Sequence, residues 1–453
     1  MHPPAAHGNS LPSYWQRVRA YAVPPSMIET ATARRRAGDW AGACAAAHID
    51  VDLRPRALAR SHGRDLADRV RADLARLAPD LLRWHMPRTA PDGLLRPGLT
   101  VPLARYGPAA GDGTAPVYLV VRTPPARADG GQRFSLTLWD GERLRDGARR
   151  HPHPRPSRRF RLDLHRHLWD AGRSGELRTR AGSGRPPDGL AGSDLLPPGH
   201  GGALDRWADE ARIVLRDAGR ATGAVTVRPG GRRRLVLDVT EGTGARLTVA
   251  DGRSTALPVL PDAATHVLPD LVLLRTGALQ PGRLHPLVAA ALAPDRAAEA
   301  PPRPPEPAGA PHRVDCRGAQ HRIGLVDGVL TPLDHPPDEI RRETLLAELT
   351  GTPLPCLQAV DRAHRHPDCL TGVRERLDHG DLTGALDVVE GLLGPGARLR
   401  SGPLRDALEA AARRRVGYGL HRADMDDTAP GRSCPPPPRP AGHRSRPRLA
   451  IRD

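Results

Sequence analysis

Apolar residues near the start of the chain recur at helical spacing. Leucine and valine occupy positions 66, 70, 74, 77 and 81, three or four residues apart, and so form one stripe along a helix. We expect this helix to begin near Asp65 and to break or kink at Pro79. Before it, Gly38-Asp39 suits the end of one helix and the cap of the next. Residues 1–98 are therefore predicted to form a helical region.

The period of the pattern changes over residues 99–295. The segment Phe134–Trp139 alternates between apolar and polar residues and stops at Asp140-Gly141, which is typical of a strand followed by a turn. Further runs of this kind predict an antiparallel, β-rich domain. The expected strands are 117–121, 134–139, 224–228, 235–239, 246–250 and 271–274, and a short helix at 284–292 is expected to close the domain.

Proline separates the last third of the chain from the rest. Residues 296–311 include the run Pro301-Pro302-Arg303-Pro304-Pro305, which predicts an extended linker. In the domain that follows, 312–422, two apolar runs flank Asp327-Gly328 and predict a β-hairpin. Residues 423–453 are poor in apolar side chains and are expected to be a disordered tail. The expected helices of this part are 338–349, 354–364, 369–379, 381–393 and 403–415.

These patterns together predict an α+β fold. It consists of an N-terminal helical region, a β-rich antiparallel middle domain, a Pro-rich linker and a C-terminal β-hairpin plus helical domain.

Two short segments of the chain echo each other. Gly38-Asp39-Trp40-Ala41-Gly42-Ala43 and Gly380-Asp381-Leu382-Thr383-Gly384-Ala385 share Gly, Asp, Gly and Ala at the same four positions. One interpretation is a repeated helical hairpin of the kind that binds partner proteins, although such arrays stack about three adjacent repeats. The favoured interpretation is two separate αα-hairpins that share the same capping chemistry.

The composition excludes several classes of enzyme. All 68 residues counted as lysine or arginine are arginine, a bias typical of a high-GC bacterial genome. Without lysine the chain cannot be a P-loop NTPase, a typical protein kinase or a pyridoxal-phosphate enzyme, because each needs a lysine amine. We assign no catalytic or cofactor-binding residue from the sequence. An enzyme whose residues are assembled only in space stays open.

Positive charge is concentrated in the middle of the chain. The segment 143–180 holds twelve arginines against four acidic residues, whereas residues 296–422 are balanced. Arginine binds phosphate and tryptophan stacks on bases, so this segment is a candidate nucleic-acid surface. The alternative is a solvated loop in an arginine-rich proteome. The candidate residues are Arg149, Arg150, Arg155, Arg158, Arg159, Arg161 and Trp169.

Cysteine and histidine gather in the C-terminal domain. The five cysteines are odd in number and widely spaced, which does not fit a disulfide framework. Thiolate and imidazole are ligands that zinc prefers, and four of them close a structural site. The alternative is that the cysteines are small buried apolar groups and that the chain holds no cofactor. The first choices as ligands are Cys316, His321, Cys356 and Cys369. Other candidate ligands near them in the sequence are His335, His364, His366, Asp361 and Asp368.

The sequence as a whole favours a non-catalytic role. Distinct modules without a recognisable catalytic motif predict a cytoplasmic adaptor or scaffold that binds a partner protein through its helical hairpins. The alternative is a nucleic-acid-associated protein that binds the phosphate backbone through residues 143–180. No apolar run reaches the roughly 20 residues of a membrane span, and residues 1–12 carry no basic-then-apolar signal. No membrane association is therefore expected.

Overall fold

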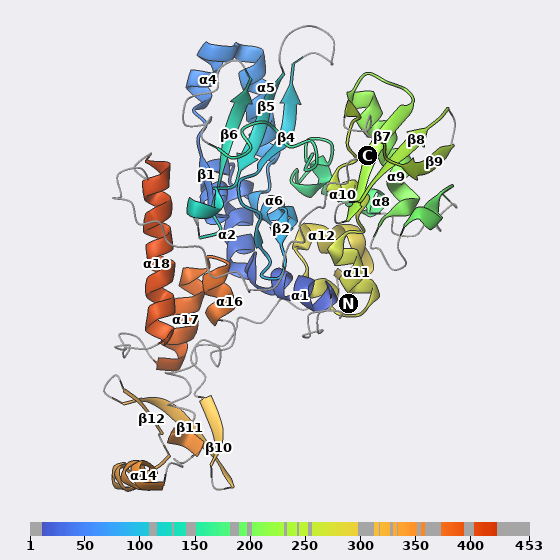
Figure 1. Ribbon diagram of the computed structural model, residues 1–453. Coiled ribbons are helices and arrows are strands. Elements are labelled where there is room, and N and C mark those ends of the chain that lie inside the picture. The colour runs from blue at the N-terminus through green and yellow to red at the C-terminus, as the bar shows by residue number, and fades with distance from the viewer. Residues whose placement is uncertain are drawn as a thin grey trace, which may run out of the picture.

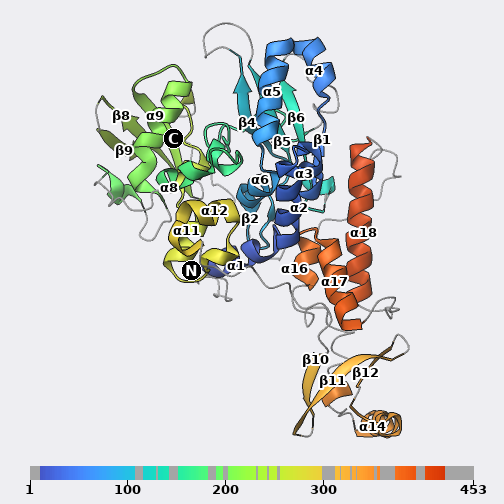
Figure 2. The same ribbon diagram turned by 180° about the vertical axis from the view of Figure 1, so that it is seen from behind.

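The computed structural model shows a mixed α+β fold (Figures 1 and 2), which confirms the predicted class. Several small, mostly antiparallel sheets are accompanied by helices. Within the described residues, no helix is both long and apolar enough to cross a membrane. The described residues are 11–107, 116–128, 131–141, 151–181, 190–196, 202–230, 233–241, 244–251, 256–297, 312–316, 318–326, 329–332, 334–350, 355–357, 373–393 and 403–423.

The first sheet combines strands from two regions of the chain. Its order is β1-β6-β5-β4, with β1 parallel to β6 and the other neighbours antiparallel. Alternate residues of a strand point to the same side, so Leu119 and Val121 of β5 are buried together with Phe134 and Leu136 of β6. The strands are β1 (Ile49–Val51), β4 (Thr100–Tyr106), β5 (Val117–Arg122) and β6 (Phe134–Asp140), and a separate pair is β2 (Arg88–Thr89) with β3 (Leu94–Leu95).

The N-terminal helices share one core with this sheet. The predicted apolar stripe lies on α5, and Pro79 begins α6 rather than kinking a helix. Proline is tolerated there because the N–H that it lacks would have no partner in a first turn. The core continues from α1 through the sheet to Leu177 and α12, so the boundary expected after residue 98 does not separate two cores. The helices are α1 (Leu11–Tyr21), α2 (Pro25–Arg36), α3 (Trp40–Ala46), α4 (Pro55–His62), α5 (Arg64–Arg76) and α6 (Pro79–His85).

A second core surrounds the sheet β7-β8-β9. Strands β7 and β8 form the predicted hairpin, and β9 pairs antiparallel to β8. Helix α9, which the sequence pattern did not predict, buries Trp207, Ala211 and Leu215 at a spacing of four in this core. The elements are β7 (Gly223–Gly230), β8 (Arg233–Val239), β9 (Ala245–Val249), α8 (Leu177–Arg180), α9 (Leu204–Asp217) and α10 (Asp262–Thr265).

The strand predicted at 271–274 is wrong, because this segment belongs to helix α11 (Pro269–Arg275). A short apolar run fits a buried strand and a buried helix equally, and Pro269 in the first turn favours the helix. The predicted short helix is α12 (Pro286–Leu292), followed by α13 (Pro294–Ala297). Short 3-10 helices are η1 (Ala126–Ala128), η2 (Arg166–Leu168), η3 (Ser174–Glu176), η4 (Ser193–Leu195) and η6 (Pro281–Arg283).

A buried ion pair joins α11 to α1. Asp270 accepts hydrogen bonds from the Arg19 guanidinium at 2.9 and 2.7 Å. The Trp84 indole donates to the same carboxylate at 3.0 Å, and the guanidinium lies 4.4 Å from the indole ring centre. Arg19 and Asp270 are at most 4% exposed. The two charges therefore depend on each other, because either one would be costly to bury without its partner.

The C-terminal part forms a small sheet at one end of the molecule and a group of helices nearer the first core (Figures 1 and 2). Strands β11 and β12 form the predicted hairpin, and β10 adds a third strand that was not expected. The predicted helix at 354–364 is described only at 355–357, and most of the expected linker and tail lie outside the described residues. The elements are β10 (His312–Cys316), β11 (Ala319–Val326), β12 (Val329–Pro332), α14 (Pro337–Thr350), α16 (Val373–Asp378), α17 (Leu382–Leu393) and α18 (Pro403–Arg422).

Helix α18 is tied to the first strand of the chain. The Tyr418 hydroxyl donates to Asp50 at 2.6 Å. The Arg422 guanidinium bonds both oxygens of Asp52, one of them at 2.6 Å. The C-terminal helices therefore pack on the edge of the first sheet.

The two echoed segments adopt the same turn. In each, a glycine with positive φ follows a helix, 76° at Gly38 and 81° at Gly380. The next residue, aspartate, accepts a hydrogen bond from the N–H of the following glycine of the motif, at 2.8 Å for Gly42 and 3.0 Å for Gly384. A Cβ at Gly42 or Gly384 would lie 2.1 or 2.3 Å from that carboxylate. The echo therefore reflects shared capping chemistry.

Candidate functional site

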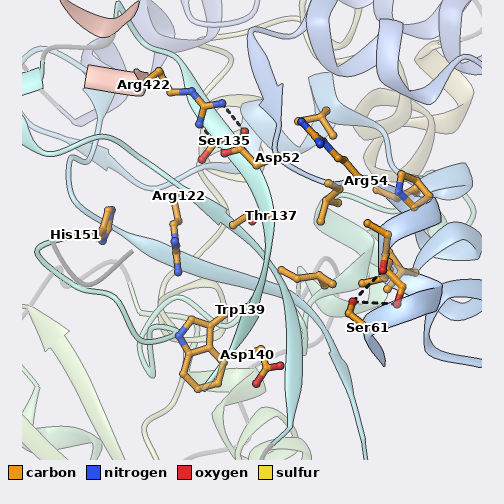
Figure 3. Close-up of a pocket in the computed structure, with 18 of the residues that line it drawn as sticks. Asp52, Arg54, Ser61, Arg122, Ser135, Thr137, Trp139, Asp140, His151 and Arg422 are labelled. Carbon is orange, nitrogen blue, oxygen red and sulfur yellow. Dashed lines mark hydrogen bonds and ion pairs between the residues drawn. The ribbon is translucent and has the colours of Figure 1, made fainter. Parts of the chain in front are cut away.

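A hollow of about 900 Å³ lies beside β6, between α4 and the end of α18 (Figure 3). Its wall contains a hydrogen-bonded chain of serine, histidine and aspartate. The Ser61 Oγ lies 2.7 Å from His62 Nδ1, and His62 Nε2 lies 2.9 Å from Asp140. This group of serine, histidine and aspartate could not be recognised from sequence spacing, because Asp140 is 78 residues from His62.

The serine in this chain is engaged by its own helix. Its hydroxyl also donates to the carbonyl oxygens of Ala57 and Leu58, at 3.1 and 3.2 Å. A nucleophilic serine needs its proton directed at the base, so we assign no catalytic role to Ser61.

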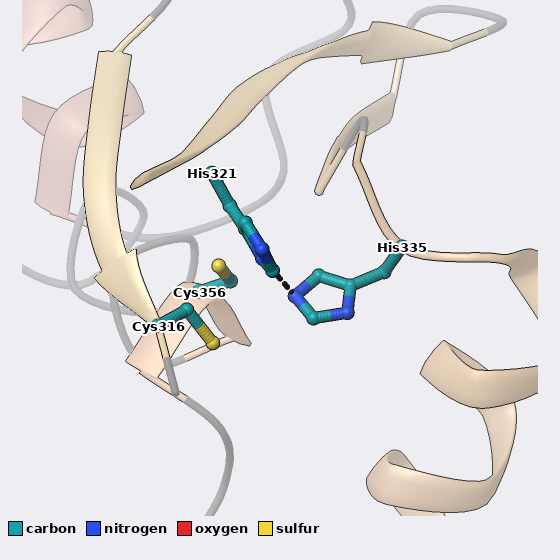
Figure 4. A group of neighbouring side chains, drawn as sticks. All are labelled: Cys316, His321, His335 and Cys356. Atoms are coloured by element: carbon teal, nitrogen blue, oxygen red, sulfur yellow. Dashed lines mark hydrogen bonds between the residues drawn. The ribbon is translucent and has the colours of Figure 1, made fainter. Parts of the chain in front are cut away.

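Four candidate metal ligands converge in the C-terminal sheet (Figure 4). Cys316 ends β10, His321 lies in β11, His335 follows β12, and Cys356 lies in the helical turn at 355–357. Their ligand atoms lie within 4.8 Å of one another. In tetrahedral zinc sites, bonds of about 2.0 to 2.3 Å place neighbouring ligand atoms roughly 3.3 to 3.8 Å apart. Small shifts would therefore give the geometry of a zinc site: the wider separations would contract, and the two imidazole nitrogens, 2.7 Å apart, would separate.

Strand register explains how the first two ligands meet. His321 pairs with Val314, two residues before Cys316. Side chains two residues apart on a strand share a face, so Cys316 and His321 point to the same side of the hairpin.

An ion pair holds the third candidate ligand, His335, next to β11. It joins Asp334, the residue before His335, to Arg322, the residue after His321. Asp334 accepts from the Arg322 guanidinium at 2.7 Å and from the Arg322 N–H at 2.6 Å. These contacts place His335 beside His321, with Nε2 of the former 2.7 Å from Nδ1 of the latter. The two imidazoles therefore present ring nitrogens to a common point.

A carboxylate orients one of these imidazoles. The Nδ1 atom of His335 lies 3.2 Å from the Glu339 carboxylate, on the far side from His321. Histidines that bind metals usually donate their second ring N–H to such a carboxylate, which fixes the tautomer and the ring orientation. The arrangement directs Nε2 of His335 toward His321, the neighbouring candidate ligand.

The two thiols lie in a buried environment. Cys316 and Cys356 are both 0% exposed, and Leu357 packs against them. Burial raises the pKa of the Cys356 thiol to about 12, and the neighbouring Cys316 thiol contributes to the rise. A zinc ion would offset this cost, because it binds and stabilises thiolates.

The structure brings together three of the four residues chosen from the sequence, namely Cys316, His321 and Cys356. Cys369, the fourth choice, lies outside the described residues. His335 completes the group instead. The signal that could have found it is the hairpin at Asp327-Gly328, which returns the chain toward β11.

Two of the residues predicted to bind nucleic acid are engaged inside the protein. Trp169 is 0% exposed, and its indole donates to the carbonyl oxygen of Leu162 at 3.0 Å. The predicted stacking role of Trp169 is therefore wrong, since its ring has no accessible face. The Arg161 guanidinium bonds Asp163 at 2.6 Å and Asp217 at 2.8 Å, so its charge is already balanced.

The remaining predicted arginines differ in exposure. Arg159 is paired with Asp262 at 2.6 Å. Arg155 and Arg158 are exposed, and Arg158 donates to a backbone carbonyl at 3.1 Å. Arg149 and Arg150 lie outside the described residues. Among the described arginines of the prediction, only Arg155 and Arg158 are therefore exposed.

Comparison of the chain with protein-family models, with curated proteins and with solved structures returns no match.

Proposed function

We propose that this chain is a non-catalytic cytoplasmic adaptor with a zinc-folded C-terminal module and a partner-binding surface on its C-terminal helices. The observation that carries the proposal is the convergence of Cys316, His321, His335 and Cys356. Four protein ligands fill a tetrahedral site and leave no position for substrate or water. Such a closed site suits a structural ion.

The size of the module favours a structural role for the ion. The described part of the module, from β10 to the helical turn at 355–357, is short, and small domains are often stabilised by a bound metal or another cross-link. Zinc would supply such stabilisation.

Exposed apolar side chains on the C-terminal helices supply the partner-binding surface. Val416 and Leu420 of α18 are 64% and 43% exposed, and Leu386 of α17 is 38% exposed. Residues four apart lie on one face of a helix, so Val416 and Leu420 form a continuous strip. Apolar surface grouped in this way is typical of sites that bind another protein.

The test is quantitative capture of partner proteins from the native host. The tagged chain is compared with a variant carrying Val416→Glu and Leu420→Glu, with and without nuclease, and bound proteins are quantified by mass spectrometry. Glutamate is a good helix former, so α18 should persist. We expect nuclease-resistant partners to fall at least about tenfold in the variant, because a charge opposes burial of the strip.

The matched control is Val249→Glu, which changes another exposed valine, 68% exposed on β9. This variant should retain every partner. Equal capture by all three proteins would contradict the adaptor proposal.

A second function is favoured by a basic hollow of about 1050 Å³. Arg96, Arg155 and Arg228 line it and have no carboxylate partner among the described residues. The ring of Phe160 lies between Arg96 and Arg159, at 5.8 and 5.2 Å from their guanidinium carbons. Arginines beside a half-buried aromatic ring suit the phosphates and bases of a single-stranded nucleic acid.

Repulsion among the arginines of the basic hollow also favours binding of a phosphate. Burial and the neighbouring guanidinium groups of Arg234 and Arg159 lower the pKa of Arg228. A phosphate would relieve this repulsion. In the capture experiment, loss of all bound protein on nuclease treatment, and in a variant carrying Arg96→Gln and Arg155→Gln, would favour this second function.

A further inference from the structure

One face of the first sheet lines the hollow of Figure 3 and carries hydrogen-bond donors. Arg122 of β5 pairs with Ser135 of β6 in the strand register, and Thr137 and Trp139 follow at alternate positions along β6. Alternation places these four side chains on the same side of the sheet. Figure 3 shows Arg122 extending from its strand toward Trp139.

Two of these donors are buried without acceptors. The Nε atom of Arg122 and the Nε1 atom of Trp139 have no hydrogen-bond partner within the described part of the chain. Burial lowers the pKa of Arg122, and the charge of Asp52 opposes that effect. Buried donors are nearly always paired, so two unpaired donors in one wall indicate an acceptor that a ligand would bring.

The acidic side chains of the hollow are already occupied. Asp52 holds the Arg422 guanidinium with both oxygens, and Asp140 lies 2.9 Å from His62 Nε2. Neither carboxylate lies within ion-pair distance of Arg122. Within the described parts of the chain, the Arg122 guanidinium therefore lines the hollow without an ion-pair partner.

The remainder of the wall combines apolar side chains, hydroxyls and basic groups. Leu53, Leu58 and Leu138 line the hollow, and Ser135 and Thr137 add hydroxyl donors near Arg122. The basic side chains in the wall are Arg54, His62, His151, His421 and Arg422. Apolar walls with convergent polar groups are typical of small-molecule sites. The apolar part suits a carbon skeleton, and the donors suit a charged oxygen group.

We infer that this hollow binds a small organic anion, whose carboxylate or phosphate group lies against Arg122, Ser135 and Trp139. Arginine offers a planar fork of donors that matches both groups, and the indole N–H adds one further donor. This binding site is separate from the zinc module and from the surface of α18 proposed above. The proposed adaptor would therefore also bind a small molecule.

The test uses the indole of Trp139 as a reporter. The full chain is labelled with 5-fluorotryptophan, which gives one ¹⁹F signal for each of its six tryptophans, and Trp139→Phe identifies the signal of interest. Inorganic phosphate and malonate are then titrated separately at constant ionic strength. We expect a saturable shift of the Trp139 signal with at least one of the two anions, while the buried Trp169 and Trp207 signals stay in place.

The variant Arg122→Gln should weaken this binding by about tenfold or more, because a bond to a charged group is lost. The control Arg173→Gln removes an exposed arginine that pairs with Glu176 and should leave the titration unchanged. Ser135→Ala is a second variant, expected to weaken binding severalfold, and decides the question if Arg122→Gln does not fold. Absence of a saturable shift with both anions, or equal affinity in the folded variants and the wild type, would overturn the inference.

Discussion

A single histidine distinguishes the four candidate ligands that the structure brings together from the four chosen from the sequence. The sequence favoured Cys369 as the fourth ligand, whereas the fold places His335 beside His321 and orients it through Glu339. The identity of the fourth ligand therefore rests on strand register and on one turn. Spacing along the chain could not reveal either.

The zinc content of variants distinguishes the ligand set with His335 from the set with Cys369. We expect the purified chain to contain about one zinc ion, and His335→Gln to lose most of it, since one ligand of a tetrahedral site is removed. Metal content is measured by inductively coupled plasma mass spectrometry after dialysis. Cys369→Ser should retain the ion, and Cys434→Ser is a control that changes another cysteine. Retention in His335→Gln together with loss in Cys369→Ser would show that the set chosen from the sequence is correct.

At the scale of elements, the sequence predicted segments whose periodicity extends over several turns or whose boundaries carry a turn signal. Helix α5, the hairpin of β7 and β8, and the hairpin at Asp327-Gly328 are confirmed. The three-residue strand β1 is too short to show alternation, and its pairing with β6 is a long-range contact. The apolar run in α11 does not distinguish a strand from a helix, because four consecutive apolar residues show no period.

The candidate metal ligands could be predicted from the sequence in part, whereas the donors of the hollow could not. Cysteine and histidine disclose their chemistry by type, so three ligands could be named from the sequence. The donors Arg122 and Trp139 could not, because an unpaired donor is recognised only once its surroundings are folded.

The ion pair between α1 and α11 should be a strong link between elements. We expect Asp270→Ala to lower the free energy of unfolding by about 3–5 kcal/mol, since Arg19 would remain buried and unpaired. Urea denaturation followed by circular dichroism measures the change. The exposed pair of Asp68 and Arg71 is the control, and Asp68→Ala should cost at most about 1 kcal/mol.

A double variant isolates the charge from the packing. Arg19→Met combined with Asp270→Leu removes both charges and should be more stable than Asp270→Ala. If the single and double variants were equally unstable, the link would depend on shape rather than on charge.

At the scale of the whole molecule, histidines in the first core and in the C-terminal part make stability depend on pH. Burial, followed by the charges of Arg88 and Arg83, lowers the pKa of His379 to about 3. Burial also lowers the pKa of His48 to about 3 and that of His85 to about 4. All three are therefore neutral in the folded protein near pH 7.

Stability should consequently fall in mild acid. In the unfolded chain these histidines have a pKa of about 6.5, so below that pH the unfolded state binds more protons than the folded state. We expect the free energy of unfolding to decrease as the pH falls from about 6.5 toward 4, by up to about 1.4 kcal/mol per pH unit for each histidine. Urea midpoints measured between pH 7.5 and 4.5 follow this loss.

The variant His379→Gln tests whether His379 contributes to the dependence of the free energy of unfolding on pH. Glutamine does not titrate, so the dependence on pH should decrease by the contribution of one proton. An unchanged slope in this variant would mean that His379 is not the titrating group.

The contact between α18 and β1 has a consequence for synthesis of the protein. Asp50 and Asp52 leave the ribosome early, whereas Tyr418 and Arg422 follow 368 and 370 residues later. Contacts between such distant residues close only when nearly the whole chain is available. Until then the nascent chain presents an incomplete sheet edge to chaperones and proteases. A premature stop codon before α18 would therefore damage a structure whose residues were translated first.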